Sequence, residues 1–184
     1  SAWMTHTDRL IALLRELSVK RGNFTLASGK RSDLYVDVRQ TSLHAEGSGL
    51  IATLILSKLH PDVRAVGGLT LGADPLVSCV AMMSHLTGSG PVHAFIVRKE
   101  AKGHGTGQQI EGLRNVPPRT KVAILEDTTT TGASLFLAVK VARAAGFEVV
   151  QCLTVVDREE GAAEMLRTEG LVLEALVSRR DFNL

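Results

Sequence analysis

Hydrophobic positions along the chain follow two different periods. Apolar residues recur at helical spacing over residues 10–17, and Gly22 is expected to end that helix. Residues 34–38 alternate apolar and polar side chains, which is typical of a half-buried strand. The same criteria predict further helices at residues 49–59, 75–86, 133–145 and 162–168, and further strands at residues 64–67, 92–97, 121–125, 147–156 and 171–177. Helices and strands therefore alternate along most of the chain.

The later strands are continuous apolar runs, which indicates a parallel sheet covered by helices on both faces. We therefore predict an α/β fold with a Rossmann-like, doubly wound parallel sheet. Neither an internal repeat nor a linker interrupts the pattern, and 184 residues suit one well-buried domain. Residues 1–184 are expected to form that domain, with about residues 1–40 as a small hood over the site. Residues 1–3 precede Met4 and look like a cloning remnant.

Composition excludes several classes of partner. The net charge is +2 and only 4% of residues are aromatic, which disfavours a nucleic-acid surface. The sequence contains neither an apolar run of membrane-spanning length nor a signal-peptide pattern. Cys79 and Cys152 lie far apart without a CxxC motif, which is typical of buried thiols in a reducing compartment. We expect a cytoplasmic protein that binds neither nucleic acid nor membrane.

The segment at residues 122–134 carries the clearest chemistry. An apolar strand leads into adjacent carboxylates, Glu126 and Asp127, and then into a threonine-rich turn before a helix. Hydroxyls and free N–H groups at a helix N-terminus bind phosphate, and the carboxylates would lie beside it near a ribose hydroxyl or hydrated magnesium. A simple helix cap needs only one such residue, and the chain has no Walker motif. The candidate sugar-phosphate ligands are therefore Thr128, Thr129, Thr130, Thr131, Gly132, Ala133 and Ser134.

This segment resembles the phosphoribosyl-diphosphate (PRPP) binding motif of type I phosphoribosyltransferases. The resemblance implies that Glu126 and Asp127 contact the ribose hydroxyls of PRPP and that the threonine turn holds its 5-phosphate. The common motif begins with aspartate, so Glu126 is a mild departure whose longer side chain can still reach the ribose.

A second segment, residues 98–105, is a basic, glycine-rich stretch within a long loop. Taken alone it suits either a solvated loop or a lid that closes over an anion. Its string, RKEAKGHG, closely resembles the catalytic loop of the orotate phosphoribosyltransferase family. The resemblance implies a homodimer in which loop 99–109 is shared between subunits. It also implies that catalysis rests on Arg98, Lys99, Lys102 and His104, together with Asp127.

Residues 67–75 resemble the pyrophosphate loop of the same family, although a tight strand-to-helix turn would look similar. The resemblance implies that Thr70, Leu71 and Gly72 bind PRPP. Some family members have a lysine at the position of Gly72. In this chain, backbone contacts would therefore contribute a larger share of the pyrophosphate binding. Asp74 could order a metal-bound water or cap the helix that follows it.

The base pocket is implied by two further segments. Residues 24–32 read alone as a hairpin, but they resemble the N-terminal signature that forms part of the orotate pocket. Ala27 replaces a lysine of some members, and Lys30 could supply that charge. Arg158 follows the predicted strand at residues 147–156, and its guanidinium suits a carboxylate or a pair of ring carbonyls. The resemblance thus implies an orotate site formed by Thr130, Arg158, Lys30 and Tyr35.

The implied reaction transfers the phosphoribosyl group of PRPP to orotate, giving orotidine 5′-monophosphate and pyrophosphate in pyrimidine (UMP) biosynthesis. The resemblance also implies Mg²⁺ as cofactor, held mainly by PRPP and water, near Asp127 or Asp74. One alternative is a phosphoribosyltransferase for another base, which loop 98–105 does not favour. The other is a PRPP-sensing regulator that binds RNA or DNA, which the small net charge disfavours.

Overall fold

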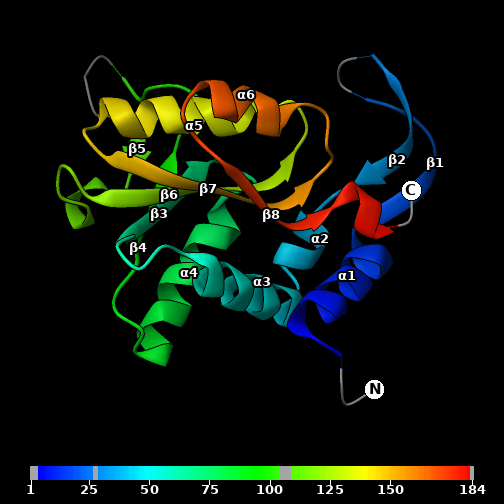
Figure 1. Ribbon diagram of the computed structural model, residues 1–184, viewed down its shortest axis with the longest axis horizontal. Coiled ribbons are helices and arrows are strands. Elements are labelled where there is room, and N and C mark those ends of the chain that lie inside the picture. The colour runs from blue at the N-terminus through cyan, green and yellow to red at the C-terminus, as the bar shows by residue number, and fades with distance from the viewer. Residues whose placement is uncertain (1–3, 27–28, 104–108, 183–184) are drawn as a thin grey trace.

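One six-stranded sheet forms the centre of the molecule (Figure 1). The structure is a computed structural model that describes residues 4–26, 29–103 and 109–182. The strand order is β5-β4-β3-β6-β7-β8, and all neighbours pair in parallel except β5, an antiparallel edge strand on β4. This confirms the α/β fold with a doubly wound, mostly parallel sheet. The strands are β3 (Ala65–Leu69), β4 (His93–Val97), β5 (Ile110–Glu111), β6 (Lys121–Thr129), β7 (Glu148–Asp157) and β8 (Leu173–Ser178).

Helices cover both faces of the sheet, as the apolar strands require. α5 (Ala133–Ala144) and α6 (Ala162–Thr168) lie on one face, and α3 (Ala45–Lys58) and α4 (Asp74–Thr87) lie on the other with α1 (His6–Leu17) beside them (Figure 1). Each face has its own buried apolar core. Residues 122–126 of β6 are all buried, because this central strand faces both cores.

The N-terminal region forms a separate two-stranded hairpin of β1 (Val19–Thr25) and β2 (Arg31–Val36), followed by the short helix α2 (Arg39–Ser42). The hairpin stands apart from the main sheet, next to the C-terminal segment (Figure 1). The expectation that Gly22 ends the first helix is wrong, because α1 ends at Leu17 and Gly22 lies within β1. Pairing of Val19 with Val36 takes the chain into the hairpin directly after the helix.

The carboxyl ends of β3, β4, β6 and β7 meet at one edge of the sheet. Leu69 is in register with Val97, and Thr129 is in register with Asp157. The strand predicted to end at Leu125 continues to Thr129, because its ladder with β7 persists beyond Glu126. The loops that follow these strands therefore share one edge, where ligands bind in doubly wound sheets.

The remaining elements are two short 3-10 helices, at Leu113–Asn115 and Arg179–Phe182. Across residues 4–26, 29–103 and 109–182, none of the helices is long and apolar enough to cross a membrane.

Candidate active site

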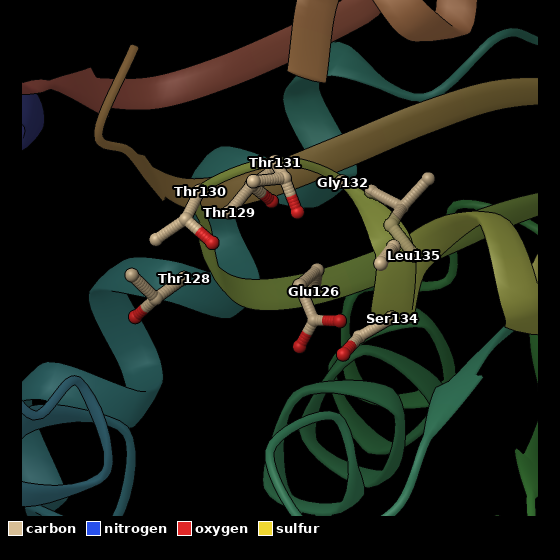
Figure 2. Close-up of a pocket in the computed structure, with 9 residues that line it drawn as sticks. Glu126, Thr128, Thr129, Thr130, Thr131, Gly132, Ser134 and Leu135 are labelled. Carbon is tan, nitrogen blue, oxygen red and sulfur yellow. The ribbon is translucent and has the colours of Figure 1, made fainter. Parts of the chain in front are cut away.

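The turn between β6 and α5 forms a small polar pocket of about 60 Å³. Figure 2 shows the chain curving from Thr129 to Gly132, with the side chains of Glu126 and Ser134 below the turn. Gly132 has a φ of 91°, and a Cβ there would lie 2.7 Å from Met165 Cε in α6. The turn can therefore close tightly only with glycine. The first N–H groups of α5 have no acceptor within the helix. They lie beside the turn that follows β6. The predicted residues Thr128 to Ser134 all line this pocket.

Glu126 is buried at the floor of this pocket, with 6% of its surface exposed. Its Oε1 accepts the Asp127 N–H at 3.2 Å, and its Oε2 is buried with no partner among the described residues. Burial raises the pKa of Glu126 to about 9, and the hydrogen bond and charge of Asp127 add to the rise. Glu126 is therefore protonated at neutral pH in the free protein. It can offer an O–H donor as well as an acceptor to a ligand.

A second cavity of about 220 Å³ opens beside the acidic pair. The loop after β3 forms one wall, and Glu126, Asp127 and Ser134 form another. Gly72 packs against the Asp127 carboxylate, so closely that a Cβ there would lie 2.5 Å from Asp127 Oδ1. Asp127 Oδ1 also accepts the Thr128 N–H at 2.8 Å. The structure thus brings the predicted residues Thr70, Leu71 and Gly72 to the acidic pair; the Thr70–Leu71 peptide bond is cis.

The basic loop begins at the same edge. Lys99 lines the 220 Å³ cavity, and Arg98 with Lys99 also lines a wider one of about 580 Å³ that reaches Thr70 and Asp74. Arg98 Nη1 lies 3.1 Å from Glu111 Oε1, and the Arg98 N–H donates to the Gln109 carbonyl. Lys102 is exposed, and His104 lies outside the described residues. Among the described residues of the basic loop, Lys99 lines the cavity of the acidic pair.

Arg158 joins the end of β7 to the hairpin. Its side chain is only 7% exposed, its Nη2 donates to Ser32 Oγ in β2 at 3.4 Å, and its Nε lies 3.6 Å from Glu160 Oε2. The Arg158 N–H donates to the Thr129 carbonyl, which places it next to the phosphate turn. Both side-chain contacts are long, so this guanidinium retains capacity for an anionic ligand.

The other base-pocket candidates lie nearby on different elements. Thr130 lines the phosphate pocket. Lys30 and Tyr35 lie on the hairpin, both exposed, and the Tyr35 ring packs on Phe24 with 5.6 Å between centroids. Neither of these two residues lines the cavities described above.

Known proteins are similar to this chain in both sequence and structure. No family model matches it. An orotate phosphoribosyltransferase of Sorangium cellulosum is 45% identical over 184 residues, which cover 99% of this chain and 95% of that protein. The chain belongs to the orotate phosphoribosyltransferase family.

Solved structures of that family superpose on almost the whole chain. Mycobacterium tuberculosis orotate phosphoribosyltransferase in complex with Fe(III) dicitrate is 40% identical, with a TM-score of 0.83, over 98% of this chain and 100% of that one. The same enzyme in complex with PRPP is 38% identical, with a TM-score of 0.78, over 98% and 100% of the two chains. The resemblance that the motifs indicated is thereby confirmed.

Orotate phosphoribosyltransferase motifs imply magnesium, which needs oxygen ligands. In the part of the chain that the structure describes, no group of three or more His, Cys, Asp or Glu side chains could hold a metal ion. Mg²⁺ usually keeps several waters and needs only one or two carboxylates plus substrate phosphates. Asp127 lines the cavity, and Asp74 Oδ1 is buried without a described partner while its Oδ2 accepts the Thr70 hydroxyl at 2.8 Å. The residues fit a magnesium ion that arrives with its substrate.

Sequence reasoning missed one charged residue of this site. Arg39, the first residue of α2, lines the 220 Å³ cavity together with Lys99 and Asp127. No motif marks it, since it lies far from the other cavity residues in sequence. The only available signal was an arginine just after the predicted hairpin.

Proposed function

We propose that this chain transfers the 5-phosphoribosyl group of PRPP to orotate, giving orotidine 5′-monophosphate and pyrophosphate in pyrimidine biosynthesis. The observation that carries the proposal is the meeting of two loops and the acidic end of β6 at one sheet edge. The threonine turn, the acidic pair and the loop at residues 70–72 surround adjoining cavities. A ligand with phosphate at one end and diphosphate at the other matches that arrangement.

Different segments of the site bind the different parts of PRPP. Residues 128–134 hold the 5-phosphate with hydroxyls and the N–H groups that begin α5. Glu126 and Asp127 hold the ribose hydroxyls. Thr70, Leu71 and Gly72 hold the pyrophosphate, mainly through their backbone. The pockets stay open to such ligands because glycine stands at 72 and 132.

Catalysis is a displacement at the anomeric carbon of the ribose. Negative charge grows on the leaving pyrophosphate, and Arg98, Lys99 and Lys102 provide fixed positive charge to stabilise it. His104 stabilises the same charge or gives the pyrophosphate a proton, since a histidine side chain can exchange a proton near neutral pH. Asp127 lends negative potential near the cation that forms on the ribose. Removal of one such group typically lowers turnover about 10²- to 10³-fold.

Mg²⁺ is the proposed cofactor, and when bound it would supply positive charge to the pyrophosphate. PRPP and water would provide most of its ligands, and Asp127 or Asp74 would orient a bound water. Buried Oδ1 of Asp74, which has no described partner, supports this role.

Orotate binds between the phosphate turn and the hairpin. Arg158 receives its carboxylate or ring carbonyls, Thr130 borders the same space, and Lys30 and Tyr35 contribute from the hairpin. The bond from Arg158 to Ser32 supports this assignment, because it links the end of β7 to the hairpin. Residues 1–184 work as one domain in this proposal, with about residues 1–40 as the hood.

The active form is a homodimer in which loop 99–109 reaches the partner's site. The protein is located in the cytoplasm. Cys79 and Cys152 are both free, which supports a reducing compartment.

Loss of orotate absorbance on addition of PRPP and Mg²⁺ tests the reaction. We expect absorbance to fall with orotate and PRPP both present, with release of pyrophosphate, and to stay constant when uracil replaces orotate. Turnover of another base but not orotate would contradict the assignment. Binding of PRPP without pyrophosphate release would instead support a non-catalytic PRPP sensor.

A further inference from the structure

The helix α2 brings a positive charge to the pyrophosphate loop. Arg39 lines the 220 Å³ cavity with Thr70, Gly72 and Asp127, whereas it does not line the 60 Å³ pocket of the phosphate turn. Its side chain is 42% exposed, so the guanidinium lies at the mouth of the cavity. Arg39 is thus placed near one end of the site and away from the other.

The backbone beneath Arg39 is firmly held. The hydroxyls of Ser18 and Thr41 share a buried hydrogen bond of 2.6 Å, which ties α2 to the end of α1. Val38, Thr41 and Ser42 are buried, and Gly47 of α3 packs directly on the Thr41 carbonyl. The backbone that carries Arg39 therefore has little further freedom to lose when the side chain binds a ligand.

The charges around the cavity favour an anion. Arg39 and Lys99 are the cations among its lining residues, and Asp127 and Glu126 are the acids. Arg39 and Lys99 therefore offer an anionic ligand two positive partners within one cavity.

The present partner of Arg39 holds it only loosely. Its Nε lies 3.6 Å from Asp37 Oδ1, which is too long for a hydrogen bond. Asp37 also accepts the Arg39 backbone N–H at 3.3 Å and the Gln40 side-chain amide at 3.1 Å. Asp37 therefore keeps partners if the guanidinium turns to a ligand.

We propose that Arg39 binds the pyrophosphate group of PRPP together with Lys99 and so determines affinity for the diphosphate end of the substrate. This rests on the proposed function, since it assigns PRPP to the cavity. A guanidinium fork matches two phosphate oxygens at once, which suits a diphosphate better than a single hydroxyl.

Direct titration of the full-length protein with Mg²⁺ present separates the two ends of the ligand. PRPP and ribose 5-phosphate share the sugar and 5-phosphate but differ in the pyrophosphate. Arg39→Ala should weaken PRPP binding about tenfold and leave ribose 5-phosphate binding unchanged, since charged hydrogen bonds are typically of that strength. Arg39→Lys should recover part of the loss. Arg167→Ala, an exposed arginine on α6, is the matched control and should bind both ligands normally.

Equal weakening of both ligands by Arg39→Ala would overturn the inference, because it would indicate a structural role. Unchanged PRPP binding would overturn it as well. The orotate assay distinguishes failure of the Arg39 inference from failure of the proposed function. Wild-type protein that binds PRPP but consumes no orotate would contradict the reaction alone. Normal wild-type turnover with an unchanged KM for PRPP in Arg39→Ala would contradict Arg39 alone.

Discussion

The most unusual residue of the site is Glu126, a carboxyl that is almost completely buried. Burying an ionised carboxylate without a partner is costly, so the group keeps its proton instead. Oε2 has no partner in the described structure, and the neighbouring Asp127 repels a second negative charge. A ribose hydroxyl would give Oε2 the partner that the free protein lacks. The free site is therefore less stable than it would be with a neutral isostere.

Glu126→Gln should change how stability depends on pH. The folded pKa of about 9 lies above the ordinary value of 4.5, so the folded state binds the proton more tightly than the unfolded state. That contribution to stability is complete below about pH 4.5 and is lost as pH rises toward 9. Without PRPP, the unfolding free energy of the wild type should fall over this window more steeply than that of the variant. Urea titrations at pH 5, 7 and 9 measure the unfolding free energy of both proteins.

Glu164→Gln, on an exposed position of α6, is the control and should keep the wild-type slope. If Glu126→Gln also kept that slope, Glu126 would be ionised in the folded protein and the buried-proton interpretation would be wrong.

Gly72 presents a different constraint, because its hydrogen leaves room for Asp127. A Cβ would lie 2.5–2.8 Å from the three carboxylate atoms, so Gly72→Ala should push that side chain away from the ribose position. We expect the KM for PRPP to rise about tenfold or more, since small displacements at a reacting centre have large effects. The thermal midpoint should change little, because Asp127 is only half-buried and can rotate. Normal kinetics with PRPP would show that Asp127 does not need its present position.

Individual site residues were predictable where they follow one another in the chain. Glu126 to Ser134 form one uninterrupted motif, and the structure indeed places all but Asp127 around one pocket. Arg39 was not predictable, since only the packing of α2 brings it to Gly72. The burial of Glu126 was also invisible, because it depends on a strand that continues past Leu125.

At the scale of elements, periodicity located the helices and central strands well. The prediction for residues 162–168 matches α6, and α5 ends one residue before the predicted bound. The errors fall where pairing overrides local pattern. β1 begins before Gly22 because β2 pairs with it, and the two-residue β5 exists only through its bonds to β4. Such pairings join distant residues, which a local pattern cannot reveal.

Two glycines of α3 provide an internal comparison of helix packing. A Cβ at Gly47 would lie 2.2 Å from the Thr41 carbonyl oxygen, whereas nothing lies within 4 Å of one at Gly49. Gly47→Ala should therefore destabilise the fold by about 1–3 kcal/mol through overpacking. Gly49→Ala should stabilise it by about 0.5–1 kcal/mol, because alanine favours the helix. Denaturant unfolding of both variants measures the difference. Equal effects would mean that α2 does not pack on α3 as described.

At the scale of the whole molecule, the two ends of the basic loop are paired with each other at the edge of the sheet. The Arg98 N–H donates to the Gln109 carbonyl at 2.8 Å, and the Gln109 side chain donates to the Arg98 carbonyl at 3.2 Å. Lys99 lines the cavity beside the acidic pair, and Lys102 is exposed to solvent. A loop fixed at its base in this way can extend toward a second subunit without disturbing the sheet.

Hybrid dimers test whether Lys102 acts across the subunit boundary. Lys102→Ala and Asp127→Ala should each be nearly inactive with the fold intact. If each site takes Lys102 from its partner, a mixed dimer has one site with both lesions and one with neither. Random pairing in two-fold dimers should then restore about a quarter of the wild-type activity. Mixing Asp127→Ala with Arg158→Ala is the control, and it should restore none, because both residues belong to the same subunit's site. No recovery in the first mixture either would mean that every site uses its own Lys102, and the loop would then be a lid within one subunit.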